Sequence, residues 1–73
     1  MSIQNLVEMA NDIGNYFAAE TDHARAVADV AQHLKRFWEP RMRRKLAEHI
    51  AATGGEGLSP LVLEAAASLA RAA

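Results

Sequence analysis

Apolar residues recur at steps of three and four along the first half of the chain, and this spacing is typical of helices that bury one face. The first run consists of Ile3, Leu6, Val7, Ala10, Ile13 and Phe17. The second run consists of Val27, Val30, Ala31, Leu34 and Phe37. The two runs predict helices over about residues 2–19 and 22–38, with Ser2 capping the first and either Thr21 or Asp22 capping the second. Because the connection between them is short, these helices are predicted to be antiparallel neighbours.

Pro40 marks the end of the second predicted helix and the beginning of a third. Proline has no N–H to donate and disfavours helical backbone at the residue before it, but it is well tolerated in the first turn of a helix. Met42, Leu46 and Ile50 then follow at steps of four. This pattern predicts a third helix over about residues 40–53.

Glycines and a serine–proline pair delimit the last predicted helix. Gly54 offers a left-handed end to the third helix, and Ser59 and Pro60 have the residue types preferred at an N-cap and in a first turn. A fourth helix is therefore predicted over about residues 60–71. No run of residues alternates between apolar and polar as a half-buried strand does. The sequence predicts an all-α protein with a single domain over residues 1–73, built as a small bundle of three to four helices.

The predicted core is small. A folded chain of 73 residues hides only about 60% of the surface that its unfolded form exposes. The last segment, residues 64–73, is rich in alanine and has one large apolar side chain, Leu69. We therefore expect the chain to gain stability by binding a partner. A homodimer through the first and last helices is one alternative, because alanine-rich faces let helices approach closely.

The residue content disfavours several classes of protein. There is no cysteine, which excludes disulfides and thiolate-bound iron–sulfur or zinc centres within the chain. No apolar run approaches the roughly 20 residues that a membrane-spanning helix needs, and the first residues lack the basic and apolar regions of a secretion signal. We expect a cytoplasmic protein that does not enter a membrane.

Candidate catalytic and metal-binding groups are few. The histidines are His23, His33 and His49. No two of them are three or four residues apart, the spacing at which one helix usually presents two metal ligands. The GGEG stretch over residues 54–57 lies between predicted helices, where a C-cap and a linker explain it better than a phosphate-binding loop does. Glu8 and Asp12 are one turn apart and are interpreted as a solvated acidic face. We expect no active site, metal or cofactor in this chain.

Basic residues are concentrated in one segment, although the whole chain has a formal net charge of −1. Residues 35–45 contain six bases against a single acid, Glu39. Phe37, Trp38 and Met42 are interleaved with these bases. A local patch of this kind can attract an acidic partner even when the protein as a whole is nearly neutral.

Three interpretations of the basic segment remain open. In the first, Phe37 belongs to the core, Trp38 packs over the corner, and the bases are solvated while their stems cover apolar surface. In the second, the chain is a small helical DNA-binding regulator, although its acidic N-terminal half disfavours contact with phosphates. In the third, the segment binds a protein, because tryptophan and arginine are the residue types that most often anchor interfaces.

Three segments of the chain together resemble a known family. They are MANDI over residues 9–13 followed by Tyr16 and Phe17, HLKRFWEPRMR over residues 33–43, and GEGLSPLV over residues 55–62. In this order and at this spacing, they are similar to the delta subunit of NAD-dependent, molybdenum- or tungsten-containing formate dehydrogenase. The resemblance covers nearly the whole chain, and the FWxPRMR pattern is its most specific part.

The resemblance implies a non-catalytic accessory subunit of a cytoplasmic enzyme that oxidises formate to carbon dioxide and passes the electrons through iron–sulfur clusters and flavin to NAD. The partner complex would carry molybdopterin cofactor, iron–sulfur clusters, FMN and NAD. Its catalytic (alpha) subunit, or its assembly factors, would bind this chain, which would support assembly, cofactor maturation or stability. The predicted partner-binding residues are Phe37, Trp38, Pro40, Arg41, Met42, Arg43 and Arg44. A narrower hypothesis is that the arginines contact the phosphates of the pterin dinucleotide cofactor.

Overall fold

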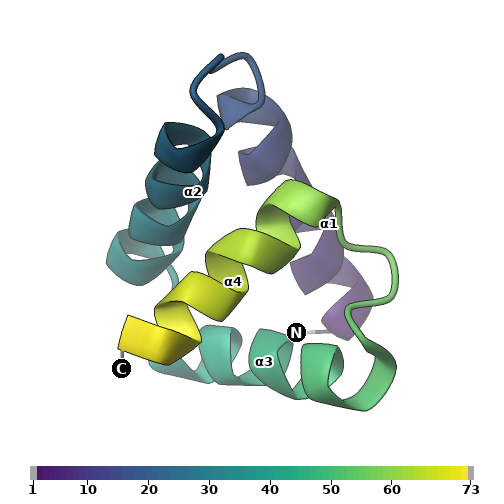
Figure 1. Cartoon of the computed structure of the whole chain (residues 1–73). Coiled ribbons are helices and arrows are strands. Elements are labelled where there is room, and N and C mark those ends of the chain that lie inside the picture. Colours follow the sequence, from purple (N-terminus) through teal and green to yellow (C-terminus); the bar gives the residue numbers. More distant parts are fainter. Residues whose placement is uncertain (1, 73) are drawn as a thin grey trace.

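The computed structural model describes residues 2–72, and these residues fold into four helices joined by short connections (Figure 1). The helices are α1 (Ile3–Phe17), α2 (His23–Phe37), α3 (Pro40–Thr53) and α4 (Pro60–Ala72). No strand occurs among the described residues. The all-α prediction is confirmed with four helices, and each predicted boundary lies within two residues of the observed one.

Side-chain oxygens cap three of the helices at the predicted positions. The hydroxyl of Ser2 accepts a hydrogen bond from the backbone N–H of Asn5 at 3.1 Å. Of the two candidates for α2, it is the carboxylate of Asp22 that accepts a hydrogen bond from the N–H of Arg25, at 3.3 Å. The hydroxyl of Ser59 accepts a hydrogen bond at 3.3 Å from the N–H three residues later in α4. Each cap satisfies a donor that the first turn of a helix leaves unpaired.

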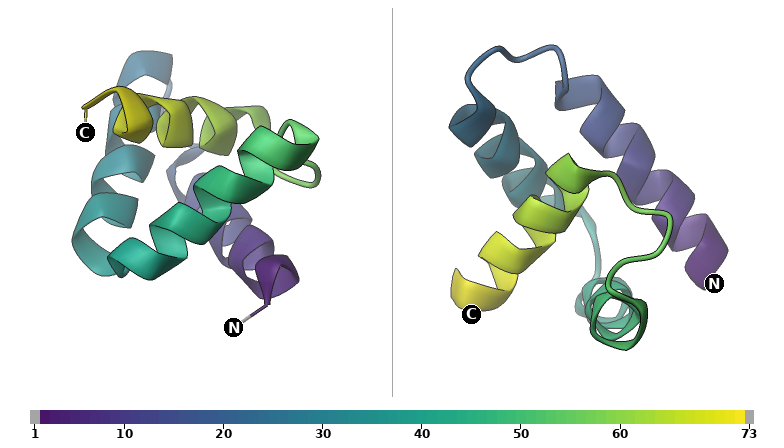
Figure 2. Two further views of the ribbon diagram at one scale, coloured as in Figure 1. Left: turned by 90° about the horizontal axis from the view of Figure 1, so that it is seen from below. Right: turned by 45° about the vertical axis from the view of Figure 1, so that its right-hand side comes forward.

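The four helices enclose a common interior. α1 and α2 run in opposite directions and diverge from the turn that joins them (Figure 1). α3 lies across the open end of this pair, and α4 crosses between the two helices and packs most extensively against α2 (Figure 2). This arrangement leaves the corner between α2 and α3 at the edge of the molecule.

One cluster of apolar side chains joins all four helices. Its members are Leu6, Ala10, Val30, Ala31, Leu34, Trp38, Leu46, Leu58, Val62 and Ala65. No polar or charged residue of the described chain is buried. Because several members are alanines, each large side chain supplies a substantial part of the apolar burial that stabilises the fold.

The corner between α2 and α3 reverses the expected positions of its two aromatic residues. Phe37 is 67% exposed, whereas Trp38 is only 5% exposed and belongs to the core cluster. Buried residues of α2 follow steps of four through Val30 and Leu34, and Trp38 is the next member of that series. Phe37 therefore lies outside the core, contrary to the expectation, and the indole of Trp38 is not displayed on the surface as the partner-binding hypothesis assumed.

α1 and α4 approach each other closely at Gly14. A Cβ atom at this position would lie 2.7 Å from Cγ2 of Val62, which is fully buried. A larger residue at position 14 would therefore overlap the side chain of Val62, and this part of the core would have to shift.

Hydrogen bonds from one side chain, that of Asn11, hold the segment between α3 and α4 against α1. The amide nitrogen of Asn11 donates to the carbonyl of Gly57 at 2.8 Å, and its amide oxygen accepts from the N–H of Ser59 at 3.0 Å. At the other end of the segment, the hydroxyl of Thr53 accepts from the backbone N–H groups of residues 55 and 56. The stretch predicted as a linker is therefore held by hydrogen bonds at both ends.

We expect Asn11→Ala to lower the free energy of unfolding by about 1–3 kcal/mol, because two backbone groups lose their partner. Asn15→Ala is the matched control. It lies one turn further along α1, is exposed, and makes no side-chain hydrogen bond within residues 2–72, so a change below about 0.5 kcal/mol is expected. Urea denaturation followed by circular dichroism measures both. Equal effects would contradict the role assigned to Asn11.

Candidate partner-binding surfaces

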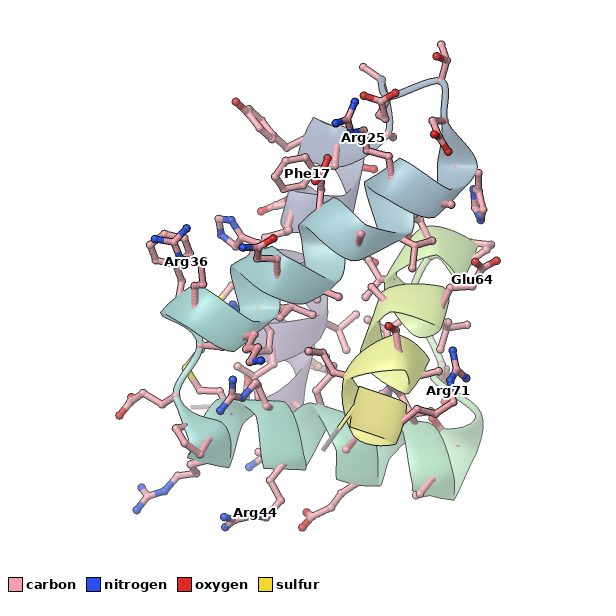
Figure 3. The ribbon with its side chains drawn as sticks, turned by 60° about the vertical axis from the view of Figure 1, so that its left-hand side comes forward. Phe17, Arg25, Arg36, Arg44, Glu64 and Arg71 are labelled. Atoms are coloured by element: carbon pink, nitrogen blue, oxygen red, sulfur yellow. The ribbon has the colours of Figure 1, made fainter. Side chains whose placement is uncertain are left out.

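Three arginines in the first two turns of α3, Arg41, Arg43 and Arg44, form what we call the basic corner. Pro40 begins α3 and so places them beside the end of α2. Arg41 and Arg44 are exposed, and their guanidinium groups form no hydrogen bond or ion pair with any described residue. Figure 3 shows Arg44 extending away from α3 into solvent. Both guanidinium groups are therefore available to an anionic partner.

Arg43 differs from the other two because it joins the helices. Its side chain is partly buried, and a guanidinium nitrogen donates a hydrogen bond to the backbone carbonyl of Lys35 at 2.8 Å. The last carbonyls of a helix have no partner within the helix, and basic side chains often satisfy them. Arg43 thus stabilises the corner between α2 and α3.

The remaining predicted contact residues divide between surface and core. Pro40 is exposed, and Phe37 projects into solvent. Met42 is partly buried and packs against the core cluster, in which Trp38 is a member. Among the seven predicted residues, the structure therefore exposes Phe37, Pro40, Arg41 and Arg44.

A row of aromatic side chains, Tyr16, Phe17, His33 and Phe37, crosses from α1 to α2 and was not predicted from the sequence. The ring centroids of successive members are 5.0, 6.1 and 4.7 Å apart. The guanidinium of Arg36 lies 5.8 Å from the ring centroid of Phe37, at the outer edge of α2 (Figure 3). Tyr16 is 78% exposed. The four-residue spacing of His33 and Phe37 within α2 was the sequence signal that could have indicated this row.

A groove of about 550 Å³ opens between α3 and α4, with the last turn of α2 on its border. Its walls are apolar and include Leu46, Ile50 and Leu69 together with alanines from α3 and α4. Its charged lining residues are Lys35, Arg43 and Arg44. The groove is thus apolar along its length and basic where α2 meets α3.

The histidines have separate surroundings. His23 is exposed and lies 2.9 Å from the carboxylate of Glu64, and a pair this exposed contributes little to stability. Nε2 of His49 lies 2.7 Å from the carbonyl of Glu56, and His33 is a member of the aromatic row. The described residues contain no group of three histidine, aspartate or glutamate side chains placed to hold a metal ion. Within residues 2–72, no helix combines the length and apolar character required to span a bilayer.

By its fold, the chain is a small all-helical protein, and its exposed arginines, aromatic row and apolar groove are surfaces of the kind that bind other proteins. The model of the NADH-dependent formate dehydrogenase delta subunit family, FdsD, matches residues 5–66. The chain therefore belongs to this family, as the sequence resemblance implied. Comparison with curated proteins gave no match, and neither did comparison with solved structures.

Proposed function

We propose that the chain is a non-catalytic accessory subunit of a cytoplasmic NAD-dependent formate dehydrogenase, and that it binds the catalytic subunit of that enzyme. Through this binding it supports the assembly, cofactor maturation or stability of the complex. Membership of the delta subunit family is the observation that carries the proposal. The small core supports it, because a chain that buries little apolar surface alone gains stability from a partner.

The basic corner supplies the charge for this contact. Arg41 and Arg44 are exposed and form no ion pair with a described residue, and Glu48 lies one helical turn after Arg44 beside both of them. Their guanidinium groups can form bidentate bonds with carboxylates of a partner. Phe37, rather than Trp38, offers an exposed aromatic ring beside them along the chain. Aromatic and arginine side chains are enriched at the centres of interfaces.

The redox groups of the enzyme belong, in this proposal, to the partner polypeptides. The chain has no cysteine to hold an iron–sulfur cluster, and its described carboxylates and imidazoles do not converge on a metal position. Molybdopterin cofactor, iron–sulfur clusters, FMN and NAD are therefore assigned to the other subunits. In this proposal, the chain contributes a binding surface to the complex and no redox group.

We expect replacement of Arg41 and Arg44 together by glutamate to lower co-purification with the catalytic subunit at least tenfold, because partner carboxylates would then face like charges. Arg25→Glu is the control, since Arg25 is exposed in the first turn of α2, away from the corner. Circular dichroism should show all variants to be folded. Failure of the unaltered chain to co-purify with formate dehydrogenase subunits would refute the proposed function, and unchanged binding by the double variant would refute the role of the corner.

A second measurement separates cofactor maturation from stability. If the chain assists maturation, the molybdenum or tungsten content per catalytic subunit should fall when the enzyme is produced without it. If the chain only stabilises the complex, the metal content per surviving subunit should be unchanged, while the subunit itself denatures at a lower temperature. If the arginines contact cofactor phosphates, the variant with glutamate in place of Arg41 and Arg44 should lower the metal content of the catalytic subunit. This should hold even when the variant chain is supplied in excess.

A further inference from the structure

The groove between α3 and α4 is an apolar surface that the chain leaves without a covering element. Leu46, Ile50 and Leu69 contribute to its walls. Several of the alanines that line it, including Ala47 and Ala51 of α3 and Ala67 of α4, are exposed to solvent. The groove has a volume of about 550 Å³, and its apolar walls come mainly from two helices. Its shape suits a helix that lays one apolar face between two others.

The charged side chains around this groove are of one sign. Lys35 comes from the last turn of α2, and Arg43 and Arg44 come from the start of α3. Within residues 2–72, no acidic residue lines the groove. An occupant with carboxylates at the matching end would be attracted to the groove and oriented within it.

A second copy of this chain would not supply those carboxylates from the same surface. In a symmetric dimer the same patch is presented by both copies. The basic residues of one groove would then face either the basic residues of the partner copy's groove or its apolar walls. Charge complementarity therefore favours a different protein with an acidic segment.

We infer that this groove receives an amphipathic helix of the formate dehydrogenase catalytic subunit, with its apolar face against the walls and its carboxylates beside Lys35, Arg43 and Arg44. The inference rests on the proposed function and adds the groove to the contacts proposed for the basic corner and Phe37. The small alanine side chains of α3 and α4 allow the backbone of the incoming helix to approach closely. The basic corner and the groove are joined through Arg43 and Arg44, which belong to both.

The test uses a matched pair of alanines in the last turns of α3. Both Ala51 and Ala52 are exposed, but only Ala51 lines the groove. We expect Ala51→Glu to weaken co-purification with the catalytic subunit at least tenfold, since it places a charge against the apolar face of the incoming helix. Ala52→Glu carries the same charge at an equivalent place in the helix and should bind as the unaltered chain does. Circular dichroism checks that both are folded.

A second pair tests the charge. Lys35 and Arg36 are neighbouring bases in the last turn of α2, and only Lys35 lines the groove. Lys35→Glu should weaken binding several-fold, and more than Arg36→Glu does. If the unaltered chain binds the catalytic subunit and both groove variants bind equally well, the inference is overturned while the proposed function stands. If Ala51→Glu instead converts a dimer of the isolated chain into a monomer by sedimentation and leaves co-purification unchanged, the groove is a contact between copies and the inference is likewise overturned.

Discussion

Trp38→Ala is expected to lower the free energy of unfolding by about 3–5 kcal/mol, because it removes the largest side chain of the core and leaves a cavity. In a domain of this size, each 1 kcal/mol lowers the midpoint of thermal unfolding by about 4–8 °C. The midpoint should therefore fall by at least about 12 °C. Thermal denaturation followed by circular dichroism provides the measurement.

Phe37→Ala is the matched control for this result. Phe37 is the adjacent aromatic residue and is 67% exposed, so its removal should change the free energy of unfolding by no more than about 0.5 kcal/mol. On the proposed function, Phe37→Ala should instead weaken binding of the catalytic subunit. The opposite outcome, a stable Trp38→Ala variant and an unstable Phe37→Ala variant, would show that the aromatic residues occupy exchanged positions.

Gly55→Ala is expected to be the next most destabilising change, for two separate reasons. Gly55 has φ of 88°, where a Cβ atom costs about 1–2 kcal/mol. The added Cβ would also overlap the side chain of Leu63, which is partly buried and packs against the core. Crowding of this kind typically costs about 1–3 kcal/mol. Thermal denaturation should show the sum of the two costs.

Gly54→Ala separates backbone strain from crowding. Gly54 also has positive φ, 77°, but a Cβ atom there would meet no atom within 4 Å. Its replacement should therefore show the strain alone, and the difference between the two variants measures the crowding against Leu63. Equal destabilisation by the two substitutions would mean that Leu63 moves aside without cost.

Local chemistry explains why the helices could be predicted. Ser2, Asp22 and Ser59 supply cap oxygens, Pro40 separates α2 from α3, and Gly54 ends α3 with left-handed backbone. Each of these signals acts within a few residues of its own position in the chain. They determined the helix boundaries without reference to packing.

The candidate site was predicted less completely. The sequence predicted a cluster of bases at the corner between α2 and α3. In the structure, Arg41 and Arg44 of this cluster are exposed. The sequence did not distinguish Phe37 from Trp38, because both are aromatic and adjacent, and the choice depended on where α2 ended. Continuing the steps of four from Val30 through Leu34 would have assigned Trp38 to the core.

Features formed between distant residues were inaccessible to sequence reasoning. The hydrogen bonds from Asn11 to the segment before α4 join residues 46 and 48 positions apart. The groove likewise combines side chains from different helices, and the contact between Phe17 and His33 joins the α1 part of the aromatic row to the α2 part. No periodic pattern within a single helix specifies such neighbours.

The sequence by itself determined four amphipathic helices, their ends, a concentration of positive charge at one corner and a resemblance to a delta subunit family. These depend on residue type and on spacing along the chain. Only the tertiary structure decided that Trp38 is buried, that Arg43 bonds the end of α2, and that α3 and α4 leave a groove between them. The physical reason is that burial and surface shape depend on how helices cross, and that crossing is set by packing among residues far apart in the chain.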